Sequence, residues 1–222
     1  GAIFVSLIYG ILRFAYFTAG DLMSFGTMFT ILFTWYFQSL GINLGIFPTA
    51  LLAIPFGVAI TILYVLIKDK LVFSYYRTQK SPPVVLAMVS IGTMFVTQAI
   101  VRIVIGPFDR RFFDGEKFIL KANEFKEMTG LNEGLTIKST QAITLIVTII
   151  VVSILFWFLN RTKTGKSMRA YSDNEDLALL SGIDPKKVVM ITWVIAAILA
   201  TIGGALYGLD KSFKPFTYFN NM

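Results

Sequence analysis

Apolar residues along this chain form blocks that are too long for the core helices of a soluble protein. A helix needs about 20 mostly apolar residues to cross the hydrocarbon layer of a bilayer. Several blocks are apolar on every face, whereas a surface helix in water shows a polar face. The sequence therefore predicts an all-α integral membrane protein, a bundle of about six transmembrane helices. The six blocks are 2–17, 22–40, 46–67, 84–105, 141–159 and 188–208.

The composition agrees with a membrane protein and excludes several kinds of chemistry. Of the 222 residues, 55% are hydrophobic and 15% are charged, whereas soluble domains carry about 25% charged residues. The chain has no cysteine and no histidine, so we expect no disulfide, no thiol catalysis and no metal site. Residues 1–222 are interpreted as a single transmembrane domain. Because the chain starts at Gly1 without a methionine, we expect it to be a fragment of a longer protein.

Basic residues predict the orientation of the helices. The formal net charge is +7, and cytoplasmic loops of membrane proteins are enriched in lysine and arginine. Two connecting segments, 68–83 and 160–187, are rich in these residues and are predicted to be cytoplasmic. The segment 106–140 has six basic and six acidic residues and is predicted to be a periplasmic loop. We expect no nucleic-acid partner. The basic residues of the two cytoplasmic segments are Lys68, Lys70, Arg77 and Lys80, then Arg161, Lys163, Lys166, Arg169, Lys186 and Lys187.

A turn at Thr18 to Asp21 separates the first two apolar blocks and carries charge at or near membrane depth. Charged residues at such depth are costly and are often functional. One interpretation is that Arg13 extends to the interface and Asp21 caps the next helix. The other is a broken or re-entrant helix whose ends line a substrate path, because irregular backbone at depth is tolerated only where protein or water satisfies it.

The segment 160–187 contains the sharpest local signal. Ser172-Asp173-Asn174-Glu175 fits a capping box, with Ser172 as the N-cap and Glu175 reaching back. Acidic residues at 173, 175 and 176 favour a helix start through the helix dipole. Gly182 is placed to end the helix in the left-handed conformation. We therefore predict a short helix over 173–181.

This short helix is predicted to dock on another surface, because a helix of its length is marginal alone. It either packs under the bundle or inserts into a groove of a partner. Its apolar or small face is predicted to consist of Leu177, Ala178, Leu180 and Ser181. In the sixth apolar block, a face of small residues predicts close helix packing in lipid. That face consists of Ala196, Ala197, Ala200, Gly203, Gly204 and Ala205.

The whole chain resembles the permease subunits of bacterial ABC importers for branched-chain amino acids. The best match is 165–204, where the family shows a glycine, an Arg-Ala pair, acidic residues, an alanine and a Gly-Ile pair before an apolar helix. These residues are Gly165, Arg169-Ala170, Ala178 and Gly182-Ile183 in this sequence. A second match is the stretch 13–21 with Gly26. Here Tyr16, Thr18 and Ala19 replace the Asn, Ala and His that are usual in the family.

The resemblance implies a coupling helix that sits in a cleft of an ATPase subunit. The residues implied in ATPase coupling are Arg169, Ser172, Asp173, Glu175, Asp176, Ala178, Gly182 and Ile183. Those implied in the substrate path are Arg13, Tyr16, Thr18, Gly20, Asp21 and Gly26. On this basis, Ala178→Arg is expected to uncouple transport without unfolding the bundle.

The implied partners are ABC ATPase subunits, a second homologous permease subunit, a periplasmic substrate-binding protein and the lipid bilayer. The location is the bacterial inner membrane, which the chain crosses several times. The sequence has no G-x-x-x-x-G-K-[ST] phosphate loop. We therefore expect a transport subunit that is not an enzyme and binds no cofactor, with ATP used by the partner subunits. Alternatives are a permease for urea or short amides and an ion-coupled secondary transporter.

Overall fold

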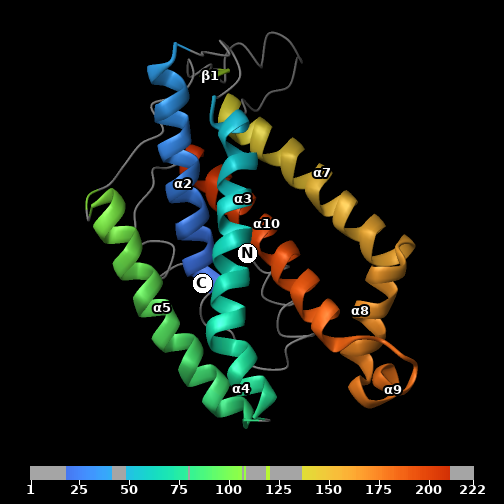
Figure 1. The fold of residues 1–222 in the computed structure, drawn as a ribbon. Coiled ribbons are helices and arrows are strands. Elements are labelled where there is room, and N and C mark those ends of the chain that lie inside the picture. The colour runs from blue at the N-terminus through green and yellow to red at the C-terminus, as the bar shows by residue number, and fades with distance from the viewer. Residues whose placement is uncertain are drawn as a thin grey trace.

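The computed structural model describes residues 19–41, 49–79, 81–106, 108, 119–120 and 137–210. These residues fold into helices, with one pair of two-residue strands, β1 and β2, that are antiparallel (Figure 1). The elements are α2 (Ala19–Ser39), α3 (Ala50–Lys68), the π-helical turn η1 (Asp69–Phe73), α4 (Ser74–Thr78), α5 (Pro83–Ile105), β1 (Ile119–Leu120), β2 (Ile137–Lys138), α7 (Ser139–Arg161), α8 (Lys163–Asp173), α9 (Glu175–Leu180) and α10 (Pro185–Asp210).

The fold confirms an all-α integral membrane protein. Four helical segments of the described residues are long and apolar enough to cross a bilayer, and they correspond to the third to sixth predicted blocks. These segments are Ala50–Thr78, Pro83–Ile105, Gln141–Arg161 and Pro185–Leu209. The second block forms α2, and the first block, 2–17, lies outside the described residues. Most of the predicted periplasmic loop, 106–140, also lies outside them.

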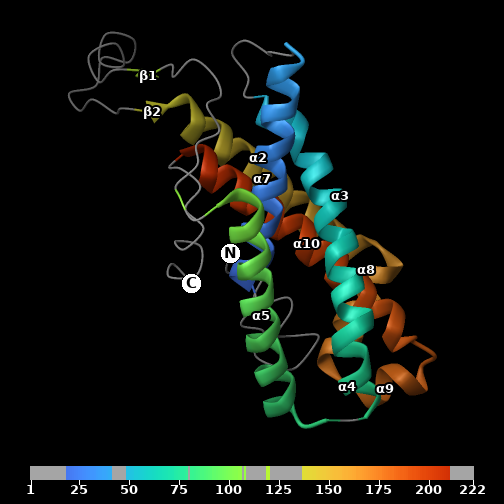
Figure 2. The ribbon, with the colours of Figure 1, turned by 60° about the vertical axis from the view of Figure 1, so that its left-hand side comes forward.

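Helices α2, α3 and α10 form the centre of the bundle, with α5 on one side and α7 on the other (Figures 1 and 2). The small residues of α10 allow its close approach to α2. A Cβ atom at Gly204 would overlap the hydroxyl of Thr27 and lie 2.7 Å from the carbonyl oxygen of Met23. Ala196, Ala197 and Ala200 are buried in the same region. The predicted role of this face in packing is therefore confirmed.

Buried threonines are a second feature of the centre. The hydroxyls of Thr27, Thr30 and Thr34 in α2 donate to carbonyl oxygens four residues earlier, at 2.7 to 2.8 Å. Thr61 in α3 and Thr192 in α10 do the same. Because the helix supplies the acceptor, these hydroxyls can be buried between helices without an unsatisfied donor.

The segment 68–83, which was predicted to connect two helices, is itself helical over most of its length. The helix that begins as α3 continues through η1 and α4 to Thr78, so the connector is limited to the four residues before α5. The physical reason is the absence of any glycine or proline between residues 57 and 82, which leaves nothing to end the helix at Lys68. The prolines act as predicted, because Pro82 is extended and Pro83 begins α5.

Candidate functional site

A helical hairpin, α8 and α9, lies at one end of the bundle below α7 and α10 (Figures 1 and 2). The turn between α7 and α8 is tight: the Thr162 hydroxyl accepts from the backbone nitrogen of Gly165 at 3.0 Å. A Cβ atom at residue 165 would lie 2.6 Å from the Cα atom of Leu159. Only glycine fits at this close approach of two backbones.

The start of α9 differs from the prediction. Asn174 is the N-cap, and its side-chain oxygen accepts from the backbone nitrogen of Leu177 at 3.1 Å. Ser172 belongs to the last turn of α8, so the capping box that placed it at the N-cap is wrong. Asn caps a helix as well as Ser does, and the extended backbone of Asn174 separates the two helices. The Glu175 carboxylate accepts from the Tyr171 hydroxyl at 2.7 Å.

The end of α9 is as predicted. Gly182 has a φ of +79°, which is the left-handed conformation. Its backbone nitrogen donates to the carbonyl of Leu179, and that of Ile183 donates to the carbonyl of Ala178, both at 3.0 Å. These two hydrogen bonds define a Schellman motif. The helix is thus fixed at both ends although it has only six residues.

The structure corrects the predicted docking face of α9, which included Ala178. Ala178 is 3% exposed and belongs to a small core formed with Met168, Tyr171 and Val188. It therefore faces α8 and α10 and does not lie on a docking face. The reason is the Schellman motif, in which the residue at this position packs against the residue after the glycine, here Ile183. The exposed apolar residues of α9 are Leu177, Leu179 and Leu180, at 59%, 43% and 85%.

The remaining residues implied in ATPase coupling are divided between the surface and this small core. Arg169 is exposed on α8 and donates to the side chain of Asn160 in α7 at 2.9 Å. Asp173 and Asp176 are exposed. Ile183 is partly buried against Ala178. The hairpin therefore presents charged residues and three leucines outward, while its inner side is fixed to α7 and α10.

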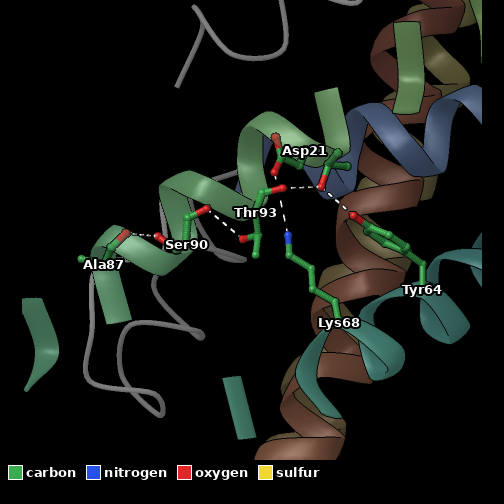
Figure 3. A network of polar contacts seen from close by, with 7 residues as sticks. Asp21, Tyr64, Lys68, Ala87, Ser90 and Thr93 are labelled. Atoms are coloured by element: carbon green, nitrogen blue, oxygen red, sulfur yellow. Dashed lines mark hydrogen bonds and ion pairs between the residues drawn. The ribbon is translucent and has the colours of Figure 1, made fainter. Parts of the chain in front are cut away.

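Within the bundle, an ion pair joins α2 to α3. The Nζ atom of Lys68 lies 3.9 Å from a carboxylate oxygen of Asp21, and the side chains are 5% and 0% exposed (Figure 3). Among the described residues neither oxygen of Asp21 accepts a hydrogen bond. The Nζ atom also lies 5.8 Å from the ring centre of Tyr64, whose hydroxyl is 2.6 Å from that of Thr97 in α5. Three helices thus contribute polar groups to one buried position.

Sequence reasoning missed this ion pair. Asp21 lies in the first turn of α2, which begins at Ala19, so it is not the N-cap. Lys68 was assigned to a loop. Gly26 packs closely against α10, because a Cβ atom there would overlap the side chain of Thr201. Gly20 is buried, and the substrate-path candidates Arg13, Tyr16 and Thr18 lie outside the described residues.

Asp69 joins η1, the turn that continues α3, to α10. Its carboxylate accepts from the indole nitrogen of Trp193 at 2.7 Å and from the Arg77 guanidinium at 2.9 Å. The only sequence signal for this contact was that Asp69 is an acidic residue within the basic segment 68–83. Because that segment was interpreted as a loop, the contact was missed as well.

The bundle, with its capped hairpin at one end and its buried ion pair, defines a multi-pass helical membrane protein. The chain belongs to the family described as "Branched-chain amino acid transport system / permease component", whose family model matches residues 1–222. The resemblance inferred from the sequence is therefore confirmed.

Curated relatives agree with this family. The chain is 25% identical over 210 residues to the high-affinity branched-chain amino acid transport system permease protein LivH of Escherichia coli (strain K12). The aligned region covers 93% of this chain and 65% of LivH. It is 30% identical over 77 residues to BraD of Pseudomonas aeruginosa, another high-affinity branched-chain amino acid permease protein (35% of this chain, 25% of BraD).

A further relative carries a different substrate in its name. The nucleoside ABC transporter permease protein NupB of Lactococcus lactis subsp. cremoris is 34% identical over 80 residues, which cover 36% of this chain and 22% of NupB. The chain thus spans about 65% of the length of the LivH proteins that it matches. No solved structure matches it.

Proposed function

We propose that this chain is the membrane-spanning permease subunit of an ABC importer in the bacterial inner membrane. It moves branched-chain amino acids, or similar small polar substrates, by alternating access. Separate ATPase subunits hydrolyse ATP, and this chain binds no cofactor and catalyses no reaction. Its other partners are a second homologous permease subunit and a periplasmic substrate-binding protein.

The observation that carries this proposal is the form of α9. It has six residues and is fixed by Asn174 at its start and by Gly182 at its end. One side is buried through Ala178, while Leu177 and Leu180 remain exposed. A short helix with outward apolar residues is what a hydrophobic groove of a partner binds. The ATPase subunit is the partner that this family requires at the cytoplasmic end.

The hairpin also has the rigidity that a coupling element needs. Its small core includes Val188 at the start of α10, and only four residues separate α9 from α10. A displacement of α9 would therefore reach the central helix α10 directly. An ion-coupled secondary transporter, the alternative from a different class, gives no reason for an exposed leucine face at this position.

Co-purification of the ATPase tests the docking role of α9. The full-length protein, purified from membranes of its own host in mild detergent, is expected to bring with it an ABC-type ATPase subunit and ATP hydrolysis activity. Leu180→Arg is expected to remove both, because it places a charge on a side chain that is 85% exposed and so leaves the fold intact. The matched control is Leu71→Arg, at a leucine of η1 that is 73% exposed.

The outcomes separate the candidates. Loss of the ATPase in Leu180→Arg and its retention in Leu71→Arg support the proposal. Absence of an ATPase from the wild-type preparation refutes the ABC permease and favours the secondary transporter. Uptake of labelled leucine, uridine and urea by cells that lack other carriers then assigns the substrate. The partial match to NupB is the observation that makes uridine, a nucleoside, the first competitor to test.

A further inference from the structure

The long helix formed by α3, η1 and α4 contains one irregular turn, Asp69–Phe73, where the backbone is π-helical. A π-helical turn inserts an extra residue into the helix and is frequently found at functional sites. It is also one of the few causes of a local bend in a helix. The residues on either side, Lys68 and Ser74, have ordinary helical dihedral angles. The irregularity is thus confined to these five residues.

A single side chain of α10 contacts both ends of this π-helical turn. Trp193 is fully buried, and its indole nitrogen donates to the carboxylate of Asp69, the first residue of the turn, at 2.7 Å. Its ring lies 5.6 Å, centre to centre, from that of Phe73, the last residue of the turn. Phe73 is also fully buried. The indole therefore fixes α10 to the turn by one polar and one aromatic contact.

The same carboxylate is bound from the other side of the turn. Arg77, in α4, donates to Asp69 at 2.9 Å across eight residues of the helix, and the two form an ion pair at 2.8 Å. Asp69 thus joins α10 and α4 through one side chain. Any change in the position of Trp193 relative to α3 changes the acceptor on which Arg77 depends.

A cleft of about 550 Å³ lies beside this contact. One wall is formed mainly by η1 and α4, including Lys70 and Ser74. The other is formed by the hairpin and the start of α10, including Tyr171 and Lys186. Asp69 lines the cleft, as does Val189, one helical turn before Trp193. The open space lets the two walls change their separation, whereas the Trp193 contact holds them at one point.

We propose that Trp193 and Asp69 are positioning residues that form a pivot, through which α10 moves the η1–α4 arm about the π-helical turn and opens or closes this cleft. The inference rests on the proposed function, because the movement begins when the ATPase displaces α9. Neither residue touches substrate. Both act by keeping α10 in contact with the η1–α4 arm while the hairpin moves.

Trp193→Phe tests the pivot because it keeps an aromatic ring in this position, although a smaller one, and removes the indole nitrogen that donates to Asp69. The matched control is Trp157→Phe in α7, where the tryptophan is 63% exposed. The full-length transporter with its ATPase and binding protein is reconstituted in liposomes, and substrate transported per ATP hydrolysed is measured. We expect at least a tenfold fall in this ratio for Trp193→Phe, with the ATPase still co-purifying, and no change for Trp157→Phe.

Conservative replacement of the acceptor gives a second readout. Asp69→Asn keeps an oxygen for the indole nitrogen but loses the ion pair with Arg77, whereas Asp69→Ala removes both contacts. We expect the ratio of substrate transported to ATP hydrolysed to be several times higher in Asp69→Asn than in Asp69→Ala. A merely structural role would alter the yield of folded protein and leave the transport ratio of the folded fraction unchanged.

A distance measurement tests the movement itself without any change at the pivot. The chain has no cysteine, so Thr78→Cys in α4 and Lys186→Cys in α10 place two spin labels on opposite walls of the cleft. The distance between the labels is expected to differ between the nucleotide-free and ATP-bound complex, and to lose this difference when Trp193→Phe is added.

An unchanged distance on ATP binding, or a normal transport ratio in Trp193→Phe, overturns the pivot even when the ATPase binds. Failure of the ATPase to bind the wild-type protein overturns the proposed function instead, so the two failures are distinguishable.

Discussion

Replacement of Lys68 by methionine tests how much the buried ion pair contributes to the stability of the bundle. Methionine keeps most of the length of the side chain but leaves the carboxylate of Asp21 without its cation, at a position that is 0% exposed. At 3.9 Å, the attraction between unit charges is about 4 kcal/mol for an effective dielectric constant of about 20. Removing one partner of a buried pair typically costs about 3–5 kcal/mol. The two magnitudes agree.

The cost is expected to appear as a fall in the apparent Tm of the detergent-purified protein. For chains of about this size, 1 kcal/mol shifts Tm by about 2–4 °C, so Lys68→Met is expected to lower Tm by about 10 °C. Lys70→Met is the control, because this lysine is two residues away and exposed. The double variant Asp21→Leu and Lys68→Met is expected to regain most of the loss, because no uncompensated charge remains buried.

Two results would refute this reasoning. If Lys68→Met and Lys70→Met have the same Tm, the ion pair does not stabilise the fold. If the double variant is no more stable than Lys68→Met, the loss comes from packing of the lysine stem and not from the isolated carboxylate. The difference between the double variant and the sum of the single variants measures the pair directly.

Three further predictions concern packing and capping. Gly204→Leu is expected to lower the apparent Tm by several degrees, because even a Cβ atom would overlap α2, whereas Gly92→Leu, with nothing within 4 Å, is expected to leave Tm unchanged. Ala178→Arg is expected to expose the hairpin to limited proteolysis, because the site is buried, whereas Ala170→Arg, at an exposed alanine, is not. Asn174→Ala is expected to weaken α9 by about 1 kcal/mol, measured as faster amide hydrogen exchange over 175–181; unchanged exchange would show that the cap contributes nothing.

The membrane spans and the helix ends that depend on glycine or proline were predictable from the sequence. Apolar blocks of the required length have few alternatives in a bilayer, and the helical spans follow them, except that the helix of the third block continues to Thr78. Gly182 ends α9 as predicted, because the left-handed conformation strongly favours glycine. The close packing of Gly204 was predictable for a similar reason, since small residues repeated on one face of an apolar helix have a packing role in lipid.

The polar contacts inside the bundle were not predictable, because they join residues that are far apart in the sequence. Lys68 was assigned to a loop by the usual distribution of basic residues, yet its partner Asp21 lies 47 positions earlier. Asp69 and Trp193 are 124 positions apart. The burial of Ala178 depends on the orientation of α9, and residue type alone does not decide which side of so short a helix faces its own chain.

The two kinds of contact in the bundle have different consequences for movement. Where Gly26 meets Thr201 and Gly204 meets Thr27, the helices touch with no room for a Cβ atom, and close-packed surfaces of this kind transmit displacement without deforming. At Asp69, α10 contacts the η1–α4 arm through directional hydrogen bonds beside an open cleft. The carboxylate accepts from two donors, Trp193 and Arg77, and can keep one hydrogen bond while the other is lost. Under the proposed function, a displacement that enters through α9 would meet rigid contacts at Gly26 and Gly204 and an adjustable contact at Asp69, which would place the change of shape at the π-helical turn.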